Sequence, residues 1–193
     1  MLILGLGNLL LADEGVGVHA VQQMMAEKRF AGDVVALDIG TAVLDALPAL
    51  ETAERVVIID AMKADGPPGS VYRIPYDDCL RPSTIGSMHG FDLSRVLAMT
   101  GRRDRPEITV IGVEPARIDW SMDLSEAVAA ALPVVLQAVE EEITGHRKKC
   151  ADAPPSRPSL PVNPGHRGER SPTSRQEEPQ LSFERRFANS CRM

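Results

Sequence analysis

The chain has 193 residues, of which 44% are hydrophobic and 25% charged, a balance typical of a globular protein with one main core. Aromatic residues make up only 4%, which disfavours the stacking surfaces of modules that bind single-stranded nucleic acid. No apolar run approaches the ~20 residues that span a bilayer, and the first residues lack the basic start of a secretory signal. We therefore expect a cytoplasmic protein that binds no nucleic acid and does not insert into a membrane.

The formal charge of −6 is unevenly distributed along the chain. Residues 1–145 hold 22 acidic and 11 basic side chains, a net charge of −11, whereas residues 146–193 hold 5 and 10, a net charge of +5. The second segment also contains 7 of the 15 prolines and almost no periodic apolar pattern, so it buries too little apolar surface to offset its ordering entropy. We predict one domain over 1–145, followed by a basic, proline-rich, disordered tail over 146–193. The acidic domain favours a partner with a basic patch.

Strands and helices alternate along the first segment. Short apolar runs rich in β-branched residues predict buried strands at 2–6, 34–37, 56–59 and 108–111. Helical patterns lie between or after them, at 16–24, 44–50, 91–100 and 123–143. A turn at 66–69 precedes a further edge or antiparallel strand at 70–74. This order predicts an α/β fold: three layers, with a mostly parallel twisted sheet and helices on both faces.

Ligands of open α/β sheets bind outside the carboxyl ends of the strands. Polar residues at those ends are Asp13, Glu14, Asp38 and Asp60, and His89 lies just before the helix at 91–100. Two carboxylates and an imidazole, from Glu14, Asp60 and His89, suit a borderline divalent ion such as nickel or zinc, with positions left open for water or substrate. Taken singly, the two carboxylates also fit helix caps or turn residues, and the histidine fits a surface loop.

Several common sites are not supported by the sequence. Gly5 and Gly7 follow the first strand, but a dinucleotide-binding GxGxxG loop would require glycine at the position of Leu10. A GxSxG nucleophile elbow and a Walker A lysine motif are both lacking, which disfavours serine-hydrolase and P-loop chemistry.

Four motifs in chain order resemble those of the hydrogenase maturation endopeptidases, which process the large subunit of [NiFe] hydrogenases. They are GLGNLLLADEGVG at 5–17, DIGT at 38–41, IDA at 59–61 with GPPG at 66–69, and SMH at 87–89. GVEP at 112–115 and the long last helix complete the match, which covers residues 1–145.

The resemblance implies a cytoplasmic endopeptidase that removes the C-terminal extension of the [NiFe] hydrogenase large-subunit precursor after nickel insertion. It assigns metal binding to Glu14, Asp60 and His89, with nickel presented by the substrate as the recognition element. Either the ion polarises the scissile bond, or Asp13 or Asp38 serves as general base in an aspartic-type reaction. A non-cleaving, nickel-sensing escort of the precursor has the same ligands and remains open. A nucleotide-binding, flavodoxin-like protein would need phosphate-binding loops that the sequence lacks.

Overall fold

A computed structural model describes residues 1–30, 32–79, 86–87 and 90–151. Its central sheet has the strand order β2-β1-β3-β6-β4, and β5 pairs with β3 off this path. The strands span Leu2–Leu6 (β1), Val35–Gly40 (β2), Arg55–Lys63 (β3), Val71–Pro75 (β4), Gly86–Ser87 (β5) and Glu107–Val113 (β6). Strands β2, β1, β3 and β6 are parallel, whereas β4 is antiparallel to β6 and β5 to β3. The predicted mostly parallel sheet is confirmed.

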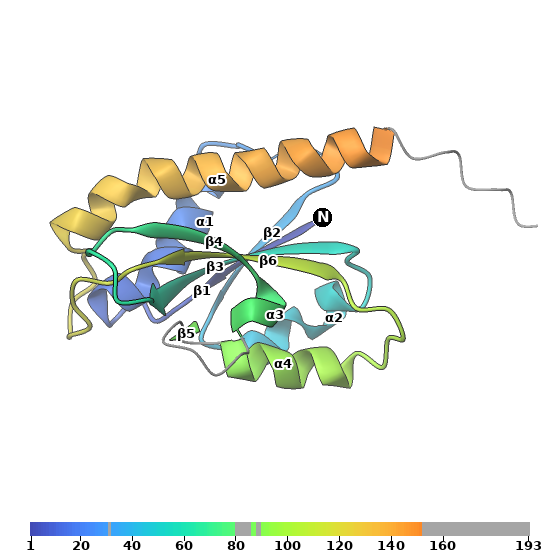
Figure 1. Cartoon of the computed structure of the whole chain (residues 1–193), viewed down its shortest axis with the longest axis horizontal. Helices are drawn as coiled ribbons and strands as arrows, with labels where there is room; N and C mark the ends of the chain where they lie inside the picture. Colours follow the sequence, from blue (N-terminus) through green and yellow to red (C-terminus); the bar gives the residue numbers. More distant parts are fainter. Residues whose placement is uncertain (31, 80–85, 88–89, 152–193) are drawn as a thin grey trace, which may run out of the picture. The chain divides into compact units, whose positions relative to one another are not determined.

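Helices cover both faces of this sheet (Figure 1). On one face lie α1 (Val16–Ala26) and α5 (Glu126–Ala151), which pack on the odd-numbered residues of β3, such as Val57 and Ile59. On the other face lie α2 (Leu47–Leu50), α3 (Tyr76–Cys79) and α4 (Gly90–Met99), together with the 3-10 helix η2 (Val43–Ala46). These pack on the even-numbered residues of β3. Because side chains alternate along a strand, neighbouring residues of β3 contribute to two different cores.

Most of the predicted strands and helices are present. The bounds of two helices differ from the prediction, one near a proline and one at a basic segment. The predicted helix at 44–50 is divided into η2 and α2, and Pro48 lies in the first turn of α2, where a missing N–H is tolerated. Helix α5 begins at Glu126, continues through Pro133 and ends at Ala151. The expected boundary after Gly145 is therefore too early, since residues 146–151 are helical; basic side chains near a helix C-terminus favour this extension. Residues 152–193, where the disordered tail was predicted, lie outside the described residues.

The structure also contains elements that the sequence patterns did not predict. A 3-10 helix, η1 (Ala12–Gly15), connects β1 to α1, and the short elements α3 and β5 lie between β4 and α4. In the part of the chain that the structure describes, no helix is both long and apolar enough to cross a membrane.

Candidate active site

Glu14 and Asp60 lie at the carboxyl edge of the sheet. Asp60 is near the end of β3 and fully buried, and Glu14 lies on η1 with 8% of its surface exposed. Helix η1 packs against β3, so the two carboxylates reach this edge from different parts of the chain. The structure thus places two of the three residues that were predicted to bind a metal ion at this edge, on elements that contact each other. Their role as metal ligands stays a prediction.

Gly17 allows this close approach. A Cβ atom at this position would lie 2.0 Å from the carbonyl oxygen of Ile59 and 2.4 Å from that of Leu6. The start of α1 therefore rests directly on the backbone of β3 and β1, with no room for a side chain. This contact fixes the segment that carries Glu14 next to the end of β3.

Asp60 points to the face of the sheet that carries α2, α3 and α4, because its neighbours Ile58 and Met62 belong to that core. Cys79 of α3 lies on the same face and is half-buried. Burial raises the pKa of the Cys79 thiol to about 11, and the negative charges of Asp78 and Asp60 add to this effect. The thiol therefore stays protonated at neutral pH, which makes it a poor nucleophile.

Asp13 binds the loop after β6. Its Oδ2 atom accepts hydrogen bonds from the backbone N–H groups of Ala116, at 2.8 Å, and Arg117, at 3.0 Å. Its Oδ1 atom accepts one from the N–H of Ser125 at 2.7 Å, just before α5 begins. The side chain is fully buried. These contacts give Asp13 a structural role in holding the loop; its role as a general base stays a prediction.

Asp38 lies on the opposite face of the sheet from Asp60. Both Asp38 and Ile59 pair with Gly5 of β1, so the two side chains share the face covered by α1 and α5. There Asp38 is exposed, and its Oδ2 atom accepts a hydrogen bond from Gln22 Nε2 of α1 at 2.8 Å. The structure does not bring this carboxylate together with Asp60, and its role as a general base also stays a prediction.

His89, the third predicted ligand, lies outside the described residues. Among the residues that are described, no group of three His, Cys, Asp or Glu side chains is arranged to hold a metal ion. Carboxylate oxygens bind nickel or zinc, but these ions also favour imidazole nitrogen, so two carboxylates alone make an incomplete ligand set. The described pair therefore fits part of a metal site and requires a further donor.

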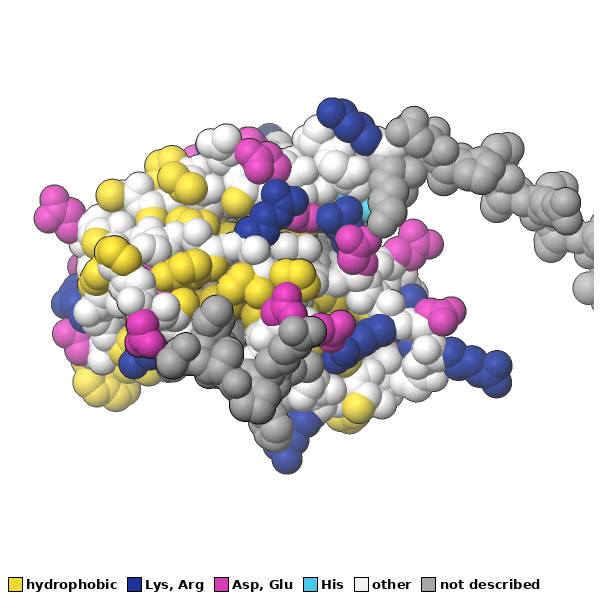
Figure 2. All heavy atoms as spheres, in the orientation of Figure 1, with side chains coloured by type: hydrophobic (Ala, Val, Ile, Leu, Met, Phe, Trp, Pro, Cys, Tyr) yellow, Lys and Arg dark blue, Asp and Glu magenta, His cyan; other side chains and the backbone are white. Residues whose placement is uncertain are grey.

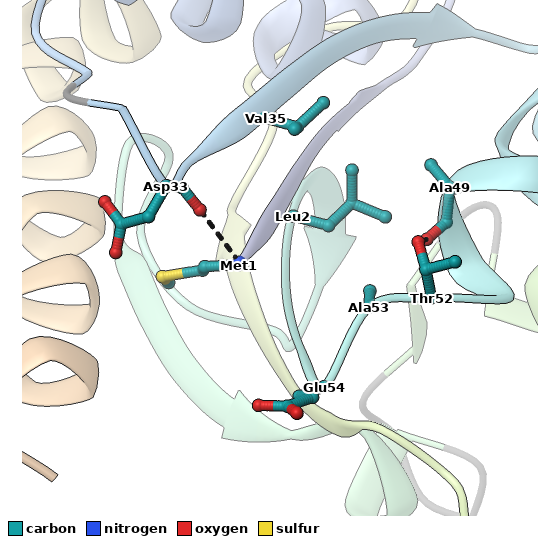
Figure 3. A pocket seen from close by; sticks show the side chains of 8 residues that line it. All are labelled: Met1, Leu2, Asp33, Val35, Ala49, Thr52, Ala53 and Glu54. Carbon is teal, nitrogen blue, oxygen red and sulfur yellow. Dashed lines mark hydrogen bonds between the residues drawn. The ribbon is translucent and has the colours of Figure 1, made fainter. Parts of the chain in front are cut away.

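A cavity at the other end of the strands has a different character. It is lined by Met1 and by Leu2, the first residue of β1, by Asp33 and Val35 next to them, and by the segment before β3 (Figure 3). The N-terminal amine of Met1 donates a hydrogen bond to the carbonyl oxygen of Asp33 at 3.1 Å. This cavity lies at the amino edge of the sheet, away from Glu14 and Asp60, where ligands of α/β sheets rarely bind.

The sequence reasoning missed the loop after β6. Its backbone is held by Asp13, and it exposes the chain's single tryptophan, Trp120. The available signal was a large apolar residue between Asp119 and Ser121 in a polar loop that directly follows a buried strand. A single exposed apolar residue needs no explanation, so this signal becomes informative only when the structure shows further exposed apolar residues near it.

Comparisons with known proteins agree on one family. A sequence model described as hydrogenase maturation protease matches residues 18–142. The hydrogenase expression/formation protein HupD of Rhodobacter capsulatus is 34% identical over 149 residues, which cover 73% of this chain and 70% of that protein. The hydrogenase 2 maturation protease of Escherichia coli K12 is 27% identical over 147 residues, covering 72% and 87%.

Solved structures show the same similarity. The [NiFe] hydrogenase maturation protease HybD from Thermococcus kodakarensis aligns with a TM-score of 0.62 and 32% identity, over 73% of this chain and 97% of that one. The hydrogenase maturating endopeptidase HybD from Escherichia coli has a TM-score of 0.62 and 27% identity, over 77% and 92%. The fold and these comparisons define a peptidase of the α/β class. The chain belongs to the hydrogenase maturation protease family.

Proposed function

We propose that this protein is an endopeptidase that acts in the cytoplasm on the large-subunit precursor of a [NiFe] hydrogenase and removes its C-terminal extension after nickel insertion. The proposal rests mainly on the two buried carboxylates, Glu14 and Asp60, at the carboxyl edge of the sheet. A family of hydrogenase maturation proteases supplies the substrate class, and the two carboxylates supply oxygen ligands for an ion that the substrate carries.

Nickel acts in this proposal as part of the substrate. Glu14 and Asp60, with His89 as the third ligand, complete the coordination of the ion that the precursor presents. A nickel-free precursor offers no such contact, so the protease distinguishes the two forms by a difference in affinity. Removal of the extension is irreversible and therefore commits the precursor to its mature form.

The peptide bond can be cleaved by a metal-assisted route or by an aspartic-type route. A divalent ion at this position polarises a carbonyl group and lowers the pKa of a bound water. In the aspartic-type route, Asp38 is the better placed of the two predicted bases, because it is exposed whereas Asp13 is buried among three backbone donors. We favour the metal-assisted route, since Asp38 lies across the sheet from Asp60.

The decisive experiment compares purified protein with precursor that is nickel-loaded or nickel-free, read by intact mass spectrometry. We expect loss of one defined C-terminal peptide in the nickel-loaded reaction alone. The variant Asp60→Asn should bind less precursor and cleave none, because an amide of the same shape is a much weaker ligand. The matched control is Asp45→Asn, an exposed acidic residue of η2, which should cleave as the wild type does.

Each alternative gives a different result. Binding of the nickel-loaded precursor without mass loss would identify a nickel-sensing escort. Normal cleavage by a folded Asp60→Asn variant would remove the metal-binding role of Asp60. A 10²–10⁴-fold fall in kcat for Asp38→Asn, with unchanged stability, would establish the aspartic-type route and contradict the one that we favour.

A further inference from the structure

A surface patch next to the candidate site is apolar and solvent-exposed. It consists of Leu10, before η1, and Ile118, Trp120 and Met122, in the loop after β6, and we call it the apolar platform. The exposed fractions are 49% for Leu10, 36% for Ile118, 83% for Trp120 and 63% for Met122. Figure 2 shows hydrophobic side chains exposed at the end of the domain where β6 enters this loop in Figure 1. Grouped large apolar side chains on a surface mark interaction sites.

The platform is held rigidly by backbone hydrogen bonds. Leu11 and Ser121 form a parallel β-bridge, in which Ser121 N–H donates to Leu10 O at 3.1 Å and Ala12 N–H donates to Ser121 O at 2.7 Å. This register puts Leu10 across from Trp120. The carboxylate of Asp13 fixes the two ends of the loop. A surface that is already ordered loses little conformational entropy when a partner binds.

The loop keeps its polar side chains engaged with itself while the apolar ones face outward. Ser121 Oγ donates to Asp123 O at 3.2 Å and accepts from Asp123 N–H at 3.0 Å. Arg117 forms an ion pair with Asp119 at 3.4 Å. The polar groups therefore stabilise the loop, and the side chains of Ile118, Trp120 and Met122 remain available for another molecule.

Position and charge indicate the partner. The platform adjoins η1, which carries Glu14, so a molecule seated on it lies beside the carboxylate pair. The loop itself exposes two carboxylates, Asp119 and Asp123, against one cation, Arg117. Residues 1–145 as a whole carry a net charge of −11, from 22 acidic and 11 basic side chains. The complementary surface is an apolar patch rimmed by lysine or arginine. A second acidic copy of this chain is a poor match, because like charges would meet.

We infer that the apolar platform is a docking site for the folded protein substrate, separate from the carboxylate pair that receives the metal ion. The inference rests on the proposed function, and it adds that the protease binds the hydrogenase large-subunit precursor through an apolar, basic-rimmed patch outside the cleaved segment. Trp120 is the central contact, since large aromatic residues carry much of the binding energy in protein interfaces.

The test compares three intact proteins: wild type, Trp120→Ser and Met99→Ser. Met99 is a matched control because it is also a large, exposed apolar residue, 60% exposed, but lies at the far end of α4. Initial rates are measured by mass spectrometry over a range of nickel-loaded precursor concentrations. We expect KM for Trp120→Ser to rise at least about tenfold with kcat within about twofold of wild type, the behaviour of a binding hot spot. Met99→Ser should match wild type.

Folding and assembly are checked on the same samples. Trp120 is so exposed that its replacement should leave the melting temperature unchanged. Raised ionic strength should increase KM of the wild type, because salt screens the basic rim of the precursor from the acidic protease. An unchanged KM for Trp120→Ser would overturn the inference, as would an equal rise for Met99→Ser. Sedimentation that shows a dimer dissociated by Trp120→Ser would overturn it in favour of self-association.

The two proposals fail in different ways. If the wild-type protein binds the precursor without cutting it, the proposed endopeptidase activity is contradicted. The docking site is then tested by comparing the Kd of Trp120→Ser with that of wild type for the same precursor. A wild-type protein that cuts normally, with no effect of Trp120→Ser on KM or Kd, leaves the endopeptidase in place and removes the docking site. A wild-type protein that neither binds nor cuts contradicts both.

Discussion

The carboxylate of Asp13 accepts a hydrogen bond from the backbone N–H of Ser125 at 2.7 Å, across 112 positions of sequence. Through this contact, the residue before Glu14 also fixes the start of α5. Because Asp13 binds Ala116 and Arg117 as well, one buried side chain connects η1, the loop after β6 and α5. A change at Asp13 therefore affects all three of these segments.

The first prediction concerns this anchor. Asp13→Ala removes the acceptor of three buried or partly buried N–H groups and should lower the free energy of unfolding by at least about 2 kcal/mol. Chemical denaturation measures this loss. Asp38→Ala is the matched control, since Asp38 is exposed with one side-chain partner, and it should cost less than about 1 kcal/mol. Equal stability of Asp13→Ala and wild type would show that the loop is held by other contacts.

A second prediction concerns Gly17. The methyl group of Gly17→Ala would meet the carbonyl oxygens of Ile59 and Leu6, so α1 must move away from the sheet, at a cost of about 3 kcal/mol or more. Gly32→Ala, where an added Cβ has no neighbour within 4 Å, should change stability by less than about 1 kcal/mol. Thermal melting compares the two variants. If Gly17→Ala melts like the wild type, the close approach of α1 to β3 is incorrect.

The third prediction concerns a buried ion cluster on the α5 side of the sheet. Glu142 of α5 is buried and forms ion pairs with Arg55 of β3 and Arg73 of β4. Glu142→Gln leaves the largely buried Arg55 with the half-exposed Glu107, at 3.8 Å, as its acidic partner and should cost up to about 3–5 kcal/mol. Arg73→Gln should cost less than about 1 kcal/mol, because the Arg73 side chain is half-exposed.

Urea denaturation of both variants decides this point. The double replacement Arg55→Met with Glu142→Leu should regain most of the loss, because it removes both charges together. A Glu142→Gln variant as stable as wild type would show that the cluster contributes nothing to folding. Cleavage by the folded fraction should be unaffected, since these residues lie away from Glu14 and Asp60.

A fourth prediction concerns alkaline pH and helix α3. Burial raises the pKa of Tyr76 to about 12 and that of Cys79 to about 11, from ordinary values of 10.0 and 9.0. Both groups release a proton more readily in the unfolded chain, so their contribution to stability is full below pH 9 and is lost as pH rises from about 9 to 12. The urea midpoint should fall over this range.

Substitutions assign the effect to these side chains. Tyr76→Phe and Cys79→Ala remove the titrating groups, so the alkaline loss should be smaller in each variant than in wild type. The comparison is made between two pH values for each protein, which separates titration from any general loss of packing. An identical pH dependence in all three proteins would assign the alkaline transition to other groups.

The sequence by itself determined the layers of the domain and the edge of the sheet where chemistry is expected. Apolar runs such as 2–6 and 56–59 have the length of a single strand, and they lack the alternating polar residues of a strand with one face in solvent. They therefore predicted strands buried on both faces, as in a parallel sheet. The order of strands and helices then placed Glu14 and Asp60 at the carboxyl edge of the sheet, which is where the structure has them. Their role in binding a metal ion stays a prediction. Periodicity failed at Gly145, where a favourable helix end and an ion pair of Arg147 with Asp33, at 3.0 Å, extend α5 into a basic segment.

Only the tertiary structure decided where each carboxylate points. Asp13 and Glu14 are adjacent on η1, which packs against β3, yet the carboxylate of Asp13 is engaged by backbone donors more than 100 positions away. Asp38 and Asp60 lie in two parallel strands of the same sheet, β2 and β3, but the register through Gly5 puts them on opposite faces. The physical reason is that side-chain direction alternates with every residue of a strand, so it depends on pairing partners and distant hydrogen bonds that no local pattern contains.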